Sequence, residues 1–207
     1  MSQAVTKRAP DPEERRKQIL AAAVEVFADK GFHKTRVSDI ARAAGVAHGL
    51  IYHYFESKDD LLTSIFDGNW SLFTKVLEDL VDQPELSAGD KLSRVVDLLL
   101  EALEVAPKTI QVVIQEVSRS DRFAAPHNVQ AFRRTFSAVE RILERGQRDG
   151  EVRPDGDPRL MSHVFMGAME MVCTGWLLGH MADQRPTDMK QTLVQTLLGG
   201  IVVDKRD

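Results

Sequence analysis

The chain has 207 residues, 43% of them hydrophobic, and a formal net charge of -4 at pH 7. This length and apolar content allow a sizeable core, which excludes a chain that is disordered throughout. A single cysteine, Cys173, excludes an intrachain disulfide framework and a CxxC metal or redox motif. The N-terminus has no apolar signal sequence, and no segment reaches the roughly 18 apolar residues of a membrane span, so we expect a cytoplasmic protein without a membrane partner.

The charge is unevenly distributed along the chain. Residues 1–58 carry ten Lys/Arg and seven Asp/Glu, a balance of +3, whereas the other 149 residues carry 17 and 24, a balance of -7. A mildly basic N-terminal part on an acidic body is compatible with local contact to DNA, although +3 alone is weak support.

Apolar residues recur with helical spacing along nearly the whole chain, and no stretch alternates strictly as in a β-strand. The pattern predicts an all-α fold of about nine helices. The expected helices are 13–30, 36–44, 48–54, a long one opening after Ser57, one after Asp90, one at Pro107, and then 127–149, 158–182 and 187–203, the last capped by Thr187.

Two short predicted helices, 36–44 and 48–54, flank Gly45. Small and apolar residues in the first of them allow close helix crossing, and Gly45 can take the left-handed conformation of a tight turn. This pattern also occurs in helical hairpins that do not bind DNA. The segment from Ala47 to Phe55 contains polar aromatic residues and no acidic residue before Glu56, so it can face a polyanion.

Residues 15–66 resemble the tetracycline-repressor (TetR) family of bacterial regulators. The resemblance consists of G-F-x-x-T, V-x-D-I-A-x-x-A-G-V, G-x-I-Y-x-Y-F and S-K-x-x-L-L, in this order and at the family's spacing. It implies a nine-helix homodimer without catalytic activity. Residues 1–56 would form a helix-turn-helix DNA-binding domain, and residues 57–207 a ligand-binding and dimerisation domain.

The resemblance also implies contacts with double-stranded operator DNA. Thr35 and Arg36, at the start of the second helix, would hold a phosphate, and residues of the third helix would reach base edges in the major groove. Lys58 resembles the family's phosphate-contacting lysine, and Lys7 with Arg8 would form an arm in the minor groove. The expected DNA-binding residues are Thr35, Arg36, Ala47, His48, Gly49, Tyr52, His53 and Lys58.

Several of these positions have a structural alternative. Tyr54 and Phe55 are expected in the core, and Tyr52 fits the core as well as it fits a phosphate contact. Arg36 and Ala47 replace the Ser or Thr cap that relatives usually have, so Thr35 is an alternative cap for the second helix. The base preference of relatives therefore cannot be transferred to this chain.

The predicted helix 158–182 is apolar over most of its circumference, and helix 187–203 has a similar excess. Such helices must be buried on most sides, which requires a partner subunit or a cavity in addition to the core. The resemblance assigns both helices to a four-helix interface of the homodimer. Gly175 and Gly179 would allow a close crossing there or would simply be tolerated.

The resemblance places an effector pocket between the long fourth helix and the fifth to eighth helices. The expected ligand-binding residues are Trp70, Phe73, Ile114, Phe132, Phe136, Phe165, Met169 and Cys173. Each of them is also a candidate for ordinary core packing. Glu116, His163 and Glu170 interrupt apolar faces and would orient a ligand or accept a cation, unless they form salt bridges or lie on the surface.

Two classes of effector fit these residues. Arg119, Arg122, Arg133 and Arg134 would bind the phosphates of an acyl-coenzyme A, or form a solvated basic patch. A lipophilic or cationic toxic compound fits the aromatic and acidic residues equally well.

Enzymatic function has little support, because the chain has no GxSxG, GxxxxGK[ST], GxGxxG or HExxH motif. We expect no catalytic residue, no metal and no cofactor other than the effector. The sequence therefore predicts a small-molecule-responsive transcriptional regulator, most simply a repressor that binds a palindromic operator as a homodimer. The alternative is a helical adaptor that binds only protein.

Overall fold

The computed structural model describes residues 11–118 and 126–202, in which the regular elements are helices and one isolated β-bridge joins Val152 to Val202. The predicted all-α class is confirmed. The chain forms two compact units, of which the first ends at Phe66 and the second begins at Asp67. The boundary between the units thus lies inside the fourth helix, later than the expected residue 56, because that helix buries Leu61, Leu62 and Phe66 almost completely.

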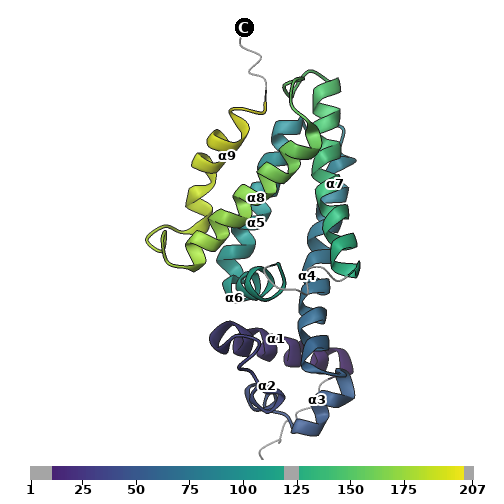
Figure 1. Ribbon diagram of the computed structural model, residues 1–207, viewed down its shortest axis with the longest axis vertical. Coiled ribbons are helices and arrows are strands. Elements are labelled where there is room, and N and C mark those ends of the chain that lie inside the picture. The colour runs from purple at the N-terminus through teal and green to yellow at the C-terminus, as the bar shows by residue number, and fades with distance from the viewer. Residues whose placement is uncertain (1–10, 119–125, 203–207) are drawn as a thin grey trace, which may run out of the picture. The chain divides into compact units, whose positions relative to one another are not determined.

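The first unit contains three helices and the start of a fourth (Figure 1). They are α1 (Pro12–Lys30), α2 (Val37–Ala44), α3 (His48–Tyr54) and α4 (Lys58–Val81), of which α4 continues into the second unit. Helix α2 packs against both α1 and α3. Side chains with less than 2% exposure form the centre of this unit, among them Ile19, Phe27, Ile40, Ile51 and Phe66.

The turn between α2 and α3 depends on Gly45. This residue has φ +65° and ψ 34°, which is the left-handed conformation. Its N–H donates to the Arg42 carbonyl at 3.2 Å, and the N–H of Val46 donates to the Ala41 carbonyl at 3.0 Å. These two bonds form a Schellman motif, which satisfies the last carbonyls of α2 and turns the chain toward α3.

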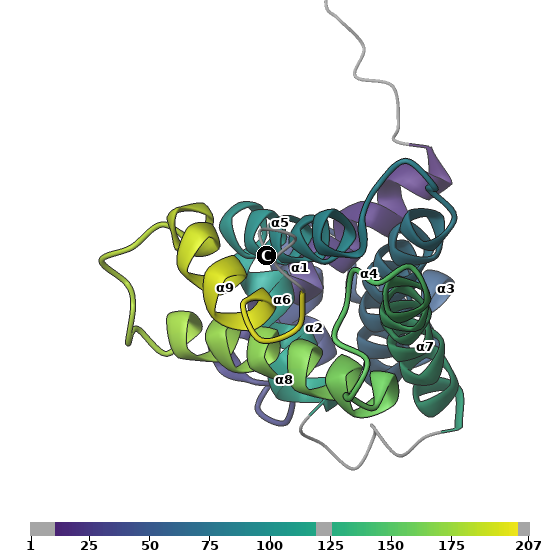
Figure 2. The same ribbon diagram turned by 90° about the horizontal axis from the view of Figure 1, so that it is seen from above.

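The second unit holds the remaining helices. They are α5 (Ala88–Val105), α6 (Pro107–Val112), the π-helical turn η1 (Val113–Ser118), α7 (Pro126–Arg148), α8 (Pro158–Leu177), the 3-10 turn η3 (Pro186–Met189) and α9 (Lys190–Leu198). Helix α7 contacts α8, and α5 contacts α7, α8 and α9. Figure 2 gives a view of these helices from above. Buried residues of α4, α5, α7 and α8 form one continuous core, which includes Leu77, Leu92, Val96, Val139 and Phe165.

Proline opens five of the described elements, namely α1, α6, α7, α8 and η3. Proline suits this position because its missing N–H would have no helical partner there and its φ is already helical. At the start of α8, the Asp157 carboxylate also accepts the Arg159 N–H at 2.9 Å. The predicted start of this helix, an Asp cap followed by Pro158, is confirmed.

Helix α8 ends at Leu177, earlier than the predicted residue 182. The reason is Gly179, which has φ +83°. Its N–H donates to the Trp176 carbonyl at 2.9 Å, and the N–H of His180 donates to the Gly175 carbonyl at 3.0 Å. Gly179 is therefore a helix stop of the same type as Gly45, and neither a crossing point nor a tolerated interior residue.

The last helix is shorter than the predicted range 187–203. Thr187 lies inside the 3-10 turn, where its hydroxyl donates to the Glu104 carboxylate instead of capping a helix. Helix α9 ends at Leu198, before Gly199 and Gly200, and the chain then reaches the β-bridge of Val202.

The conformation of Gly45 leads to a prediction about stability. Gly45→Ala is expected to lower the free energy of unfolding by about 1–2 kcal/mol, because an L side chain is strained in the left-handed region. A Cβ at this position would meet no atom within 4 Å, so the variant introduces no steric clash and tests only the backbone strain. Gly49→Ala is the matched control, because Gly49 is helical and its Cβ would also meet open space. Urea unfolding with equal losses for both variants would contradict this assignment.

Candidate functional site

One face of α3 exposes ring side chains to solvent. The residues expected to face DNA from this segment are all exposed, namely Ala47, His48, Gly49, Tyr52 and His53. Tyr52 is 52% exposed, and its ring packs edge-on against that of His48 with centroids 5.4 Å apart. Ile51, on the opposite side of α3, is 1% exposed and holds the helix on the core. The face therefore offers hydrogen-bonding rings and no acidic side chain.

The two aromatic residues that follow Tyr52 on this segment differ in burial. Tyr54 is half-buried, and Phe55 is almost fully buried. The guanidinium carbon of Arg16 lies 5.0 Å from the centre of the Phe55 ring, and Arg16 also donates to the Ser64 hydroxyl at 3.1 Å. Phe55 is thus a core residue, as one of the two interpretations of the sequence expected.

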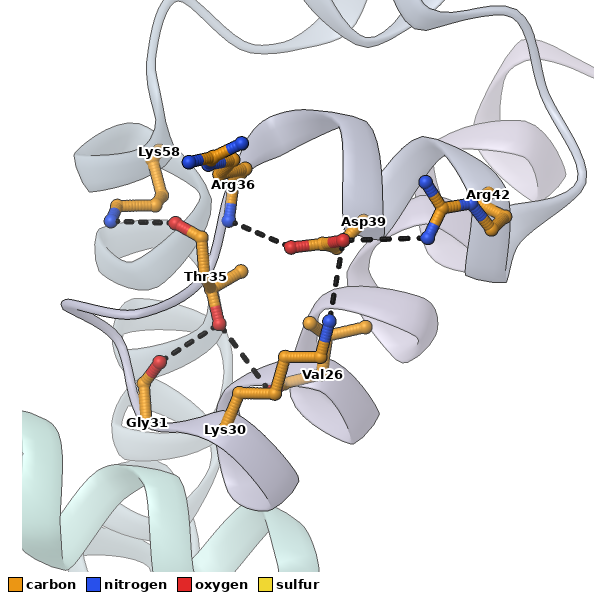
Figure 3. Close-up of polar contacts among 8 residues, drawn as sticks. All are labelled: Val26, Lys30, Gly31, Thr35, Arg36, Asp39, Arg42 and Lys58. Atoms are coloured by element: carbon orange, nitrogen blue, oxygen red, sulfur yellow. Dashed lines mark hydrogen bonds and ion pairs between the residues drawn. The ribbon is translucent and has the colours of Figure 1, made fainter.

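The N-terminus of α2 is capped by the side chain of Asp39 and not by that of Thr35. The Thr35 side chain is buried, and its hydroxyl donates to the Gly31 carbonyl at 2.8 Å. Arg36 is the residue before the helix, and its N–H donates to the Asp39 carboxylate at 3.1 Å (Figure 3). The Thr35 hydroxyl is therefore used inside the fold, whereas the Arg36 side chain is exposed.

Asp39 also joins α1 to α2. Its carboxylate lies 3.2 Å from the Lys30 ammonium and 3.5 Å from the Arg42 guanidinium (Figure 3). The Arg36 N–H, followed by the Lys30 side chain, lowers the pKa of the Asp39 carboxyl below its usual value. Asp39 stays ionised at neutral pH, so it holds the exposed Arg42 side chain on one side of α2.

Lys58 points toward the interior of the first unit. Its ammonium donates to the carbonyls of Phe32 at 2.7 Å and Thr35 at 2.9 Å, and it lies 4.2 Å from the centre of the Phe32 ring. Two of its three donors are therefore occupied by the loop between α1 and α2. This arrangement fixes the start of α4 against that loop. The predicted arm residues Lys7 and Arg8 lie outside the described residues.

A pocket of about 330 Å³ lies in the second unit, among α4, α5, α6, η1, α7 and α8. Its wall is mainly apolar, and it includes the start of the π-helical turn, a rare conformation that is frequent at functional sites. The lining residues are Asn69, Trp70, Leu72, Phe73, Val76, Leu98, Leu99, Ala102, Ile110, Val113, Ile114, Phe132, Phe136, Met166, Met169, Glu170 and Cys173.

Seven of the eight expected ligand-binding residues lie on this wall, namely Trp70, Phe73, Ile114, Phe132, Phe136, Met169 and Cys173. Phe165 does not, because it is fully buried in the core. The residues of α8 on the wall are Met166, Met169, Glu170 and Cys173, which follow the i, i+3, i+4, i+7 spacing of one helix face. The same spacing on α4, extended from Phe73, would have found the missed residues Asn69 and Val76.

Aromatic rings stack along one side of the pocket. The rings of Trp70 and Phe132 are 5.2 Å apart and inclined by 14°, and those of Phe132 and Phe136 are 4.4 Å apart and inclined by 25°. Phe73 meets Trp70 edge-on. Beyond the wall, the His163 ring continues the series at 4.6 Å from Phe136. Helices α4 and α7 thus give the pocket an aromatic wall.

Other polar residues considered in the sequence do not reach the wall. His163 is exposed, and its Nδ1 lies 2.8 Å from the Arg159 carbonyl. Arg133 is exposed, and Arg134 pairs with Glu78 through contacts of 3.0 and 3.1 Å. The structure does not describe the side chain of Glu116 or any part of Arg119 and Arg122.

The state of the Cys173 thiol and the placement of metal-ligating side chains bear on catalysis and metal binding. Burial, with a smaller effect of the Glu170 carboxylate, raises the pKa of the Cys173 thiol to about 11. The thiol is therefore protonated at neutral pH and is a poor nucleophile. In residues 11–118 and 126–202, no group of three or more His, Cys, Asp or Glu side chains is placed to hold a metal ion.

Helix α8 also presents an apolar face to solvent. Leu160, Val164 and Met171 are each at least 60% exposed, and their spacing puts them on one side of the helix. Leu178, just beyond the helix, is 58% exposed. The apolar residues of α9 instead pack on the core, with Leu193, Val194 and Leu197 half-buried and Leu198 buried. Within the described segments, no helix combines the length and the hydropathy needed to cross a membrane.

Comparison with known proteins agrees with both units. Residues 19–65 match the profile described as "Bacterial regulatory proteins, tetR family", and residues 85–177 match "Tetracyclin repressor-like, C-terminal domain". The HTH-type transcriptional repressor KstR2 of Rhodococcus jostii is 32% identical over 167 residues, which cover 78% of this chain and 79% of that protein. The fatty acid metabolism regulator protein of Bacillus subtilis is 29% identical over 187 residues, or 89% of this chain and 94% of that protein.

Solved structures show the same fold. FadR from Bacillus halodurans has a TM-score of 0.81 and 28% identity, and the alignment covers 93% of this chain and 98% of that one. FadR from Bacillus subtilis in complex with stearoyl-CoA has a TM-score of 0.79 and 28% identity, with 89% and 98% coverage. The helix-turn-helix, the apolar pocket and these similarities together show that the chain belongs to the tetR family of bacterial regulatory proteins.

Proposed function

We propose that this regulator is a repressor that binds a palindromic operator as a homodimer and leaves it when a small lipophilic effector enters the pocket. The observation that carries this proposal is the exposed face of α3, with its imidazole and phenol rings held outward by the buried Ile51. The proposed place of action is the cytoplasm, where chromosomal DNA lies. The proposal includes no catalytic step and no cofactor.

The proposed base contacts come from His48, Tyr52 and His53, while Ala47 and Gly49 are small enough to let α3 approach the major groove. Arg36 has an exposed guanidinium that can pair with a phosphate. Thr35 and Lys58 have a different role, because their polar groups are bound within the fold.

We assign Lys58 to positioning. Its ammonium holds the Phe32 and Thr35 carbonyls, and Thr35 directly precedes Arg36, so Lys58 fixes the loop that presents the proposed phosphate contact. A direct phosphate contact by Lys58 would have to rely on its one remaining donor.

The effector is proposed to be lipophilic because the pocket wall is mainly apolar. The complex of FadR from Bacillus subtilis with stearoyl-CoA supports an acyl-coenzyme A. Of Arg133 and Arg134, only Arg134 is paired within the described part of the chain, with Glu78, so Arg133 is the proposed contact for its phosphates. The aromatic wall and Glu170 support a drug-like compound instead.

The proposed release works through α4, because Trp70, Phe73 and Val76 of this helix line the pocket while its first turns belong to the first unit. Helix α3 is the proposed recognition helix of each subunit. A ligand that moves α4 would change the distance between the two copies of α3 in the dimer. Half-sites about one DNA turn apart, roughly 34–36 Å, tolerate little change in that distance. Linkage requires the effector to bind the released form more tightly than the DNA-bound form.

The main test is selection of bound duplexes from a random DNA pool by the full-length protein at near-physiological salt, where nonspecific attraction is weak. We expect enrichment of an inverted repeat, because a two-fold symmetric dimer presents two equal recognition helices. A folded protein that enriches no sequence would contradict the proposal and favour the protein-binding adaptor.

Removing Arg36 and removing Lys58 are predicted to have different effects on the salt dependence of DNA binding. Arg36→Ala should weaken binding to all duplexes and reduce the slope of log affinity against log salt by about 1, because one phosphate contact is lost. Lys58→Met should also weaken binding to all duplexes but leave the slope unchanged, because its ammonium bonds to carbonyls. Binding titrations from 50 to 200 mM salt, a range of about fourfold, measure both slopes.

His48→Ala is the specificity control for these two variants. It should change the selected sequence, because the ring is proposed to meet base edges. If Lys58→Met reduced the slope as much as Arg36→Ala, the lysine would be a phosphate contact. If His48→Ala weakened specific and random duplexes equally, the base contact would be refuted.

The exposed apolar face of α8 is the proposed centre of the homodimer, with α9 beside it as the resemblance implies. Met171→Glu should shift the protein from dimer to monomer, because it puts a charge into the buried centre of an apolar interface. Sedimentation equilibrium measures the change. Gln130→Glu, at an exposed position of α7, is the control and should stay dimeric. A dimeric Met171→Glu protein would place the interface elsewhere.

A further inference from the structure

The pocket of the second unit is large enough for a compact ligand. Its volume is about 330 Å³. This is near the lower end of the roughly 300–1,000 Å³ of small-molecule sites, so a body of one or two fused rings fits it.

The walls of the pocket are suited to a flat ligand. The rings of Trp70, Phe132 and Phe136 stack with inclinations of 14° and 25° between neighbours, so their planes run nearly parallel. An aromatic ligand can pack against these rings edge-to-face or offset, and such aromatic pairs contribute beyond the area that they bury. Helix α8 brings sulfur atoms to the wall from Met166, Met169 and Cys173, and sulfur makes favourable contacts with ring edges.

The polar chemistry of the wall is dominated by one carboxylate. Glu170 is half-buried and lies on the same face of α8 as Met166 and Cys173. The negative charge of Glu170 acts on the interior of the pocket, because this charge contributes to the raised pKa of the Cys173 thiol. Among the described residues, no cation or hydrogen-bond donor contacts this carboxylate. A bound ligand can supply the missing donor, whereas a second carboxylate would be repelled in these apolar surroundings.

We infer that the effector is a compact aromatic molecule that places a hydroxyl or amine donor against the Glu170 carboxylate, and that Glu170 selects against ligands that bury a carboxylate. The inference rests on the proposed function, because it names the ligand class of the pocket that this function uses. It selects one of the two effector classes, since the aromatic wall and the charge of Glu170 favour the compact aromatic donor over the long acyl chain.

Three probes of nearly equal shape test the inference on the full-length protein without DNA. They are 2-naphthol, which has a donor, 2-methylnaphthalene, which has none, and 2-naphthoate, which is an anion. Calorimetry should show 2-naphthol binding at least about tenfold more tightly than 2-methylnaphthalene, because a hydrogen bond to a charged acceptor is worth at least that ratio. The anion 2-naphthoate should bind most weakly of the three, and stearoyl-CoA should bind more weakly than 2-naphthol.

Two variants distinguish the effect of the Glu170 charge from the effect of the pocket size. Glu170→Gln keeps the shape of the side chain and removes its charge, so it should raise the affinity for 2-naphthoate about tenfold and narrow the gap between the other two probes. Ala102→Leu narrows the pocket from α5 without changing Glu170, so it should weaken all three probes alike. If Glu170→Gln left the affinities of all three probes unchanged, or if stearoyl-CoA bound most tightly, the inference would be overturned.

Operator release is measured separately, with the selected duplex. If the naphthalene probes bind with the expected ranking, the ligand class stands even if 2-naphthol does not release the operator, and only the release step of the proposed function then fails. If stearoyl-CoA releases the operator while 2-naphthol neither binds nor releases, the proposed function stands and the ligand class is overturned.

Discussion

Helix α4 belongs to both units, and each end of it is fixed by a lysine that satisfies backbone carbonyls. At its start, Lys58 donates to Phe32 and Thr35 of the first unit. At its end, the nearly buried Lys91 of α5 donates to the Val81 carbonyl at 3.0 Å, and burial lowers the pKa of this lysine. Buried polar groups without partners are costly, so both lysines resist a shift of the ends of α4. Any change at the pocket must act on the segment between them.

The polar contacts of that middle segment with α7 are weak. The hydroxyls of Thr74 and Thr135 form a buried hydrogen bond of 2.7 Å, worth about 1 kcal/mol. The Glu78–Arg134 ion pair adds at most about 1 kcal/mol, because the arginine side chain is 62% exposed. Coupling energies between two ligand sites are typically about 1–3 kcal/mol, the same size as these contacts. A ligand of ordinary affinity can therefore outweigh these two polar contacts, while the buried Leu77 and Leu80 also hold this segment in the core.

Local rules predicted the first unit well, because they agree with its tertiary packing. Gly45 can take the left-handed conformation that ends a helix, and the residues before it have the spacing of a packed helix. Gly179 was misinterpreted, since Met181 continues the apolar period beyond it and no other stop signal follows. The role of Lys58 could not be predicted from local sequence, because the Phe32 carbonyl that it binds lies 26 residues earlier in the chain.

Helix α8 shows why the pocket was only partly predictable. Periodicity showed that this helix is apolar on most sides, but it cannot say which apolar side meets core, cavity or solvent. The structure divides the circumference into a core side with Phe165, a pocket side with Met169 and Cys173, and an exposed side with Met171. Glu170 is the one position on the pocket side where burial of a charge would be costly without a partner. Packing alone would favour an apolar residue at this half-buried position, whereas the proposed ligand gives its carboxylate a partner.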